Sequence, residues 1–178
     1  CFSQPDAKLE SHSYTPPKTP KLLAMQPQNR LRSLTIGDIR SPTKLTSAVQ
    51  KAKPLIFIRM VAQLSMRESC VKTVETFPAN IIGTINLSET MRSVDTVKVI
   101  WIIITDTRCE NQKLVWPYRV NDCLGGHDSA SSSEAYAELV TAIYRKSFPS
   151  VPGVQLVSMR SGNVIGGGSW VTDRLSLI

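Results

Sequence analysis

The sequence predicts an α/β fold built on a doubly wound parallel sheet. Segments typical of strands alternate with segments typical of helices through residues 34–159, and this alternation favours parallel strands with helices between them. Residues 97–104, VKVIWIII, are almost wholly apolar and rich in β-branched side chains. A run of this kind is typical of a strand that is covered on both faces of a parallel sheet.

The expected elements follow one another without an internal repeat. Strands are expected at residues 34–39, 55–58, 97–104 and 154–159. The first helix has Ser41 as its N-cap and Pro42 at its first position, and it ends before Pro54, which cannot continue a helix. Two further helices are expected over residues 78–94 and 132–148. Ser131 and Glu134 have the spacing of a capping box at the start of the last helix.

Residues 1–33 are expected to form an irregular, basic, proline-rich segment. Prolines break long helices and remove backbone donors, and this segment contains Pro5, Pro16, Pro17, Pro20 and Pro27. The chain has a formal net charge of +7, and residues 1–60 hold ten Lys and Arg against three Asp and Glu. A solvated basic surface is the simplest interpretation. Binding of an anionic partner stays open, but no aromatic residues interleave the charges, so we do not expect nucleic acid.

Several classes of protein do not fit this composition. The longest wholly apolar run, residues 99–104, is far shorter than the roughly 20 residues of a membrane-spanning helix. The N-terminus lacks the pattern of a secretory signal peptide. The four cysteines and two histidines show no zinc-ligand spacing. We therefore expect a cytoplasmic protein with reduced thiols, no membrane partner and no metal.

Ligands of doubly wound sheets bind at the carboxyl ends of the strands, and a series of motifs follows the expected strands here. They are GDIR at 37–40, AQ at 62–63, NIIGT at 80–84, VWPYR at 115–119, AELV at 137–140 and GNVIGGG at 162–168. The series resembles the CDP-glucose 4,6-dehydratases, nucleotide-sugar enzymes of the extended short-chain dehydrogenase/reductase family. The family binds NAD, oxidises the sugar at C4, removes water across C5–C6 and returns the hydride to C6.

The resemblance implies a partial Rossmann-like sheet that lacks its first βαβ unit. Residues 34–178 would then be a partial NAD(P)-binding domain, with the start of a substrate domain at the C-terminal end. The family holds the cofactor diphosphate on a glycine-rich turn, where backbone amides approach the phosphates at a helix N-terminus. The first glycine of this chain is Gly37, so residues 1–36 cannot supply that turn.

Carried over residue by residue, the resemblance also implies a binding site and a remnant of a catalytic site. The cofactor-binding positions would be Asp38, Ile39, Ala62, Gln63 and Asn80. The nucleotide sugar would contact Arg67 and Asn163. Thr105 stands for the family's Ser, which hydrogen-bonds the reacting hydroxyl, and Asp106 matches the acid of the dehydration step.

The sequence departs from the family at the Tyr-x-x-x-Lys pair, in which the lysine ammonium lowers the pKa of the catalytic phenol. Ala130 stands at the tyrosine position and Glu134 at the lysine position. A methyl group cannot take a proton, and a carboxylate would raise the pKa of a phenol. Arg59 also replaces a histidine of the family. These changes predict a catalytically impaired or inactive relative, in which NAD binding is doubtful.

Other functions stay open from the sequence. The family dimerises through helices that correspond to residues 78–94 and 132–148, so the chain could be a non-enzymatic partner in a homodimer, or in a heterodimer with an intact relative. The basic N-terminal third could instead bind an anionic polymer. The chain could also be a gene remnant without a selected activity.

Overall fold

The computed structural model describes residues 8–14, 33–61, 66–110, 112–113, 115–148 and 154–162. The strands within these ranges are β1 (Glu10–Ser13), β2 (Ser33–Ile36), β3 (Ile56–Arg59), β4 (Val99–Thr105) and β5 (Gln155–Ser161). The helices are α2 (Pro42–Ala52), α3 (Met66–Val71), α4 (Thr73–Arg92) and α5 (Ser129–Ser147), and a 3-10 turn, η2 (Asp106–Arg108), follows β4.

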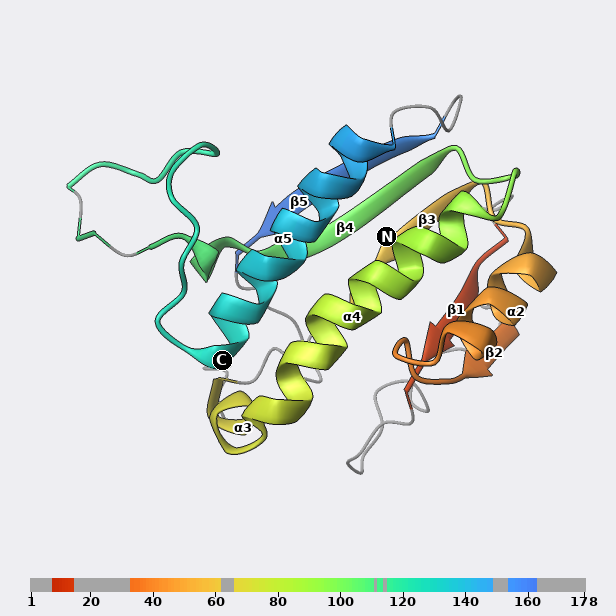
Figure 1. The fold of residues 1–178 in the computed structure, drawn as a ribbon, viewed down its shortest axis with the longest axis horizontal. Coiled ribbons are helices and arrows are strands. Elements are labelled where there is room, and N and C mark those ends of the chain that lie inside the picture. The colour runs from red at the N-terminus through yellow and green to blue at the C-terminus, as the bar shows by residue number, and fades with distance from the viewer. Residues whose placement is uncertain are drawn as a thin grey trace, which may run out of the picture.

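All strand pairs between these elements are parallel, as the sequence predicts. β3, β4 and β5 form a three-stranded sheet in that order, and β1 pairs with β2 in a separate two-stranded sheet. Figure 1 shows α4 and α5 side by side across one face of β3 and β4, with α2 next to β1 and β2. The α/β fold class is confirmed, but the described strands form two sheets rather than one.

Three expectations about the elements are wrong. Glu10–Ser13 is a strand, because it pairs with β2, although residues 1–33 were expected to be irregular. The second helix begins at Thr73, so Pro78 lies inside it instead of starting it. The N-cap of α5 is Asp128, whose carboxylate accepts a hydrogen bond from the backbone N–H of Ser131. The expected capping box is therefore absent, and Glu134 is free for another role.

The first helix begins and ends where its sequence predicts. Ser41 is its N-cap in an extended conformation, Pro42 stands in the first turn, and the chain leaves the helix at Lys53, directly before Pro54. The N-cap makes no side-chain hydrogen bond to the helix, so the stiff backbone of proline is the feature that favours this start.

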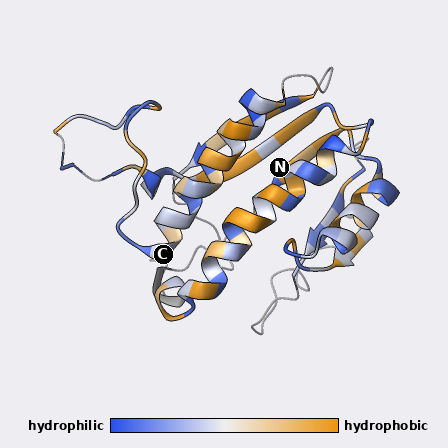
Figure 2. Ribbon diagram, viewed as in Figure 1, coloured by the Kyte–Doolittle hydropathy of each residue, from blue (hydrophilic) through white to orange (hydrophobic). Residues whose placement is uncertain are grey.

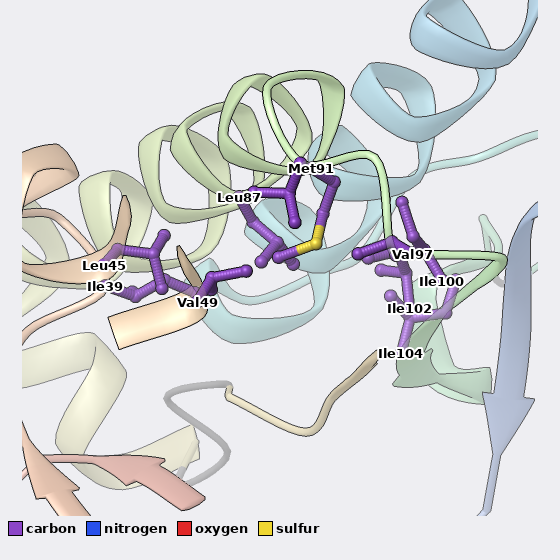
Figure 3. Close-up of a cluster of buried hydrophobic side chains, with 10 residues drawn as sticks. Ile39, Leu45, Val49, Leu87, Met91, Val97, Ile100, Ile102 and Ile104 are labelled. Carbon is purple, nitrogen blue, oxygen red and sulfur yellow. The ribbon is translucent and has the colours of Figure 1, made fainter. Parts of the chain in front are cut away.

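The hydrophobic core lies between the helices and one face of β4. Its buried side chains come from α2, α4, β4 and the segments next to them (Figure 3), namely Ile39, Leu45, Val49, Leu87, Met91, Val94, Val97, Ile100, Ile102 and Ile104. Burial alternates along β4, so Ile100, Ile102 and Ile104 are buried whereas Trp101 and Ile103 are half-buried. In Figure 2 most of β4 has the colour of apolar residues, and apolar residues also recur along α4 and α5. Among the described residues, the second face of β4 is therefore covered only in part, whereas the sequence predicts a strand covered on both faces.

Gly83 lets α4 pack closely against the segment that follows β2. A Cβ atom on Gly83 would lie 2.6 Å from Cγ2 of Ile39, a buried member of the core. Two bonds hold the same contact, because the side-chain amide of Asn86 donates to the carbonyl oxygens of Ile39 and Arg40 at 3.2 and 3.1 Å. The glycine of the NIIGT motif thus has a packing role in this structure.

We expect Gly83→Ala to lower the free energy of unfolding by about 1–3 kcal/mol, because the new methyl group overpacks this contact. Urea denaturation measures the change. Gly125→Ala is the matched control, since a Cβ there would meet its nearest neighbour, Cβ of Glu110, at 3.4 Å. Equal effects of the two substitutions would contradict the packing role of Gly83.

His12 makes the stability of the β1–β2 pair depend on pH. Its imidazole packs over Gly37, and both ring nitrogens are buried without a hydrogen-bond partner among the described residues. Burial lowers the pKa of His12 below 6.5, and the Asp38 carboxylate opposes this only in part. Below about pH 6.5 the unfolded chain therefore binds a proton that the folded chain does not.

We expect the free energy of unfolding to fall as the pH is lowered from about 6.5 towards the folded-state pKa of His12. Below that pKa both states carry the proton, so His12 no longer makes the free energy of unfolding change with pH. Urea denaturation between pH 7.5 and pH 5 measures it. His12→Gln removes the titrating group and flattens the profile in this window. An unchanged profile in that variant would show that another group is responsible.

Candidate functional site

The carboxyl ends of β3 and β4 and the N-terminal half of α5 enclose the site that the sequence predicts. The structure brings together Asn80 from α4, Thr105 from the end of β4, and Ala130 and Glu134 from α5, and it adds Arg59 from the end of β3. Ala62, Gln63 and Asn163 lie outside the described residues, and the side chain of Arg67 is not described. These four positions stay predictions.

Asp38 and Ile39 occupy the turn between β2 and α2. Both carboxylate oxygens of Asp38 accept hydrogen bonds from the Arg40 side chain, at 2.6–3.1 Å, and Oδ1 also accepts from the Arg40 backbone N–H. These bonds hold the pKa of Asp38 below its ordinary value. Ile39 is buried in the core. In this structure the predicted cofactor-binding positions Asp38 and Ile39 are thus engaged with their own neighbours.

Asn80 is fully buried, and its side chain ties α4 to α5. Its Nδ2 donates to Oγ of Ser133 at 2.8 Å, and its backbone carbonyl accepts from the Thr84 hydroxyl at 2.6 Å. The NIIGT motif, predicted as part of a cofactor site, therefore makes the contacts of a helix–helix packing motif here.

A chain of hydroxyl groups runs from the end of β4 to the N-cap of α5. Oγ1 of Thr105 lies 3.0 Å from Oγ1 of Thr107, which lies 3.2 Å from Oγ of Ser131. The Ser131 hydroxyl donates to Oδ2 of Asp128 at 2.6 Å. Since this bond uses the proton of Ser131, the remaining hydroxyls are oriented towards the Asp128 carboxylate. Asp106 lies on the exposed side of the same turn.

Arg59 and Glu134 form a buried ion pair at the centre of the site. Nη2 of Arg59 lies 4.0 Å from Oε1 of Glu134, with side-chain exposures of 0% and 1%. Nη2 also donates to the carbonyl oxygen of Asn80 at 3.4 Å, and Nη1 to that of Ile103 at 3.5 Å. Burial lowers the pKa of Arg59 and raises the pKa of Glu134, and in both cases the partner's charge opposes the shift.

A second charged cluster, absent from the sequence-based prediction, lies one helical turn further along α5. Glu138 pairs with the fully buried Arg108 of η2, and its Oε1 accepts from Nη2 of Arg160 on β5 at 3.2 Å. Arg160 also donates to the carbonyl oxygen of Val120 at 2.7 Å. Glu134 and Glu138 are four residues apart, so they share one face of α5. Both clusters could have been predicted from the i, i+4 spacing of Glu134 and Glu138, together with an arginine at the end of each of two predicted strands.

The family of the chain is shown by comparison with known proteins. Residues 8–176 match the model of the NAD dependent epimerase/dehydratase family. The chain belongs to this family. The resemblance drawn from the strand-end motifs is thereby confirmed, and so is the partial Rossmann-like fold.

One relative of this family member is the CDP-glucose 4,6-dehydratase of Salmonella typhimurium, which is 38% identical over 174 residues. The match covers 95% of this chain and 48% of the relative, so the chain spans about half the length of that enzyme.

Solved structures share the fold. WbmG of Bordetella bronchiseptica, determined in complex with NAD, has a TM-score of 0.72 at 20% identity, over 90% of this chain and 47% of that one. The UDP-glucose 4-epimerase of Thermotoga maritima has a TM-score of 0.70 at 14% identity, over 81% of this chain and 45% of that one.

The described residues do not fit the whole of the family's cofactor. The Asp38 carboxylate is taken by Arg40 and the Asn80 amide by Ser133. The buried carboxylate of Glu134 stands where the resemblance places an ammonium. The described helices α2 and α4 begin at Pro42 and Thr73 without a glycine-rich turn directly before them. Gly125 and Gly126 precede α5, but Gly126 packs against Ser131, and the Asp128 carboxylate already caps this helix at the backbone N–H of Ser131. These residues as arranged therefore do not support a catalytic step through NAD.

None of the helices in the described ranges combines the length and the apolar content that crossing a bilayer requires.

Proposed function

We propose that the chain is a catalytically impaired member of the NAD-dependent epimerase/dehydratase family, related to the CDP-glucose 4,6-dehydratases. The observation that carries this proposal is the environment of Glu134. Its carboxylate is buried and paired with Arg59 at 4.0 Å, at the position where the resemblance places the lysine of the catalytic pair. Ala130, at the position of the tyrosine, is buried at 9% exposure.

The chemistry of the first oxidation step explains why these two positions matter. A proton must leave the sugar hydroxyl as the hydride leaves its carbon, and a phenolate stabilised by a nearby cation accepts it in this family. Neither the methyl group of Ala130 nor a carboxylate already paired with Arg59 can act in that way. The hydroxyl of Thr105 and the carboxylate of Asp106 remain at the end of β4. They are suited to hydrogen-bond a sugar hydroxyl but not to start its oxidation.

The proposal also covers the binding of NAD and of a nucleotide sugar, which we expect to be weaker than in the family. The family uses NAD, and the 38% identical relative is named for CDP-glucose. Asp38, Asn80 and Glu134 would have to give up their present partners to contact a dinucleotide. We therefore propose that the chain binds NAD weakly or not at all.

Turnover of CDP-glucose tests the loss of catalysis. We expect the purified chain, supplied with NAD, to form no 4-keto product above background, measured by the absorbance of that product in base. The full-length Salmonella typhimurium enzyme, assayed in parallel, is the positive control. Measurable turnover would overturn the proposal. Calorimetric titration with NAD then separates a fold that still binds the cofactor from one that does not.

A second candidate function, assembly through the outer face of α4 and α5, is favoured by a specific observation. Tyr136, Leu139 and Ile143 recur along α5 and are 52%, 44% and 57% exposed, and Ile82 on α4 is 45% exposed. The rings of Tyr136 and Phe77 lie 6.3 Å apart, which joins the two helices into one surface. We propose that a second copy of this chain, or an intact relative, covers this surface.

Light scattering tests the assembly. We expect the chain to have twice its own mass in solution, and Leu139→Glu to reduce it to the monomer mass, because burying an unpaired carboxylate in an apolar interface is unfavourable. Val115→Glu is the matched control, since Val115 is 98% exposed and belongs to the loop between η2 and α5 rather than to either helix. A monomeric wild-type chain would exclude the homodimer, and co-purification with a full-length relative would then test the heterodimer.

A further inference from the structure

The Arg59–Glu134 pair differs from the other ion pairs of the described residues in its burial. Both of its side chains are inside the fold, at 0% and 1% exposure. The side chains of the pairs Asp38–Arg40 and Glu89–Arg92 are 29–50% exposed. In the cluster around Glu138, only Arg108 is wholly buried. A buried charge is strongly unfavourable unless it is paired, so each member of this pair depends on the other.

The pair also connects four elements of the fold. Arg59 ends β3 and reaches the carbonyl oxygens of Asn80 on α4 and Ile103 on β4 at 3.4 and 3.5 Å. Glu134 brings α5 to the same point. Two groups compensate the buried charge of Glu134: the Arg59 guanidinium, which has the larger effect on the pKa of the carboxyl, and the backbone N–H of Thr105. The guanidinium is the only charged one of the two and is therefore the main compensating group.

We propose that Arg59 determines which side chain is tolerated at position 134. The buried Arg59–Glu134 ion pair, called the charge clamp below, requires a negative charge at this position. While Arg59 is present, position 134 therefore cannot present a cation to a ligand. The coupling of the two residues rests on their geometry alone. Its meaning for catalysis rests on the proposed function, which places the family's lysine at position 134.

The charges explain why the clamp would block a simple restoration of the catalytic pair. Glu134→Lys places an ammonium next to the Arg59 guanidinium, in a space where a like-charge pair is not screened by solvent. Ala130→Tyr with Glu134→Lys restores the two side-chain types but introduces this repulsion. Arg59→His, which returns the residue that the resemblance places there, removes it because imidazole can remain neutral.

Denaturation in urea tests the clamp. We expect Glu134→Lys to raise the equilibrium constant of unfolding at least about a hundredfold, and the addition of Arg59→His to recover at least about tenfold of this loss. The exposed pair serves as the control, where Glu89→Lys, alone or with Arg92→His, changes the constant by less than about fivefold. A loss for Glu134→Lys that is the same with and without Arg59→His would overturn the proposal.

A milder double-mutant cycle serves the case in which Glu134→Lys does not fold. Arg59→Gln and Glu134→Gln are each expected to raise the unfolding constant, and the double variant is expected to raise it at least about tenfold less than the product of the single effects. Multiplicative effects would overturn the clamp. The outcome is independent of the turnover assay, because turnover of CDP-glucose by the wild-type chain would refute the proposed function while leaving the coupling intact.

Discussion

Helix α4 is the element on which the rest of the structure depends. The β1–β2 pair and the three-stranded sheet are separate sheets, and α4 contacts the segment that follows β2, the helix α2 and the helix α5. Gly83 admits Ile39 from the segment after β2, and the Thr90 hydroxyl lies 3.0 Å from that of Thr46 on α2. On the other side, Asn80 bonds Ser133 of α5. The two halves are therefore held together by side chains of one helix rather than by a backbone ladder, so substitutions on α4 affect both halves.

The position of α4 also sets the electrostatics of the strand ends. The carbonyl oxygen of Asn80 accepts from Arg59 at 3.4 Å, which directs the guanidinium towards Glu134 on the neighbouring helix. Burial shifts the pKa of each partner towards its neutral form, and the opposite charge resists that shift. Both groups stay charged and paired because the packing of α4 and α5 excludes the water that would otherwise solvate them.

The sequence predicted the parallel α/β fold because its strongest signals are local. The apolar run around Trp101 and the Ser41-Pro42 helix start need no knowledge of tertiary structure. The strand Glu10–Ser13 was missed because four residues with weak alternation become a strand only through pairing with β2. The spacing of Ser131 and Glu134 predicts a capping box, but Asp128 is the cap, three residues before Ser131, and the carboxylate of Glu134 turns into the interior. The sequence contained both halves of the ion pair as separate departures from the family, and only the fold shows that they meet.

Most of the motif residues have packing roles in this structure, so their presence says little about ligand binding. Asn80, Gly83 and Glu138 belong to the motifs that resemble the family's, but each makes a buried or part-buried contact within the fold. Their presence is explained by stability and does not require a bound dinucleotide. Asp106 is different, because it is exposed at the end of β4 and contributes no side chain to the core. Under the proposed function, Asp106 is therefore a better place to look for ligand binding than the longer NIIGT motif, because packing does not require its side chain.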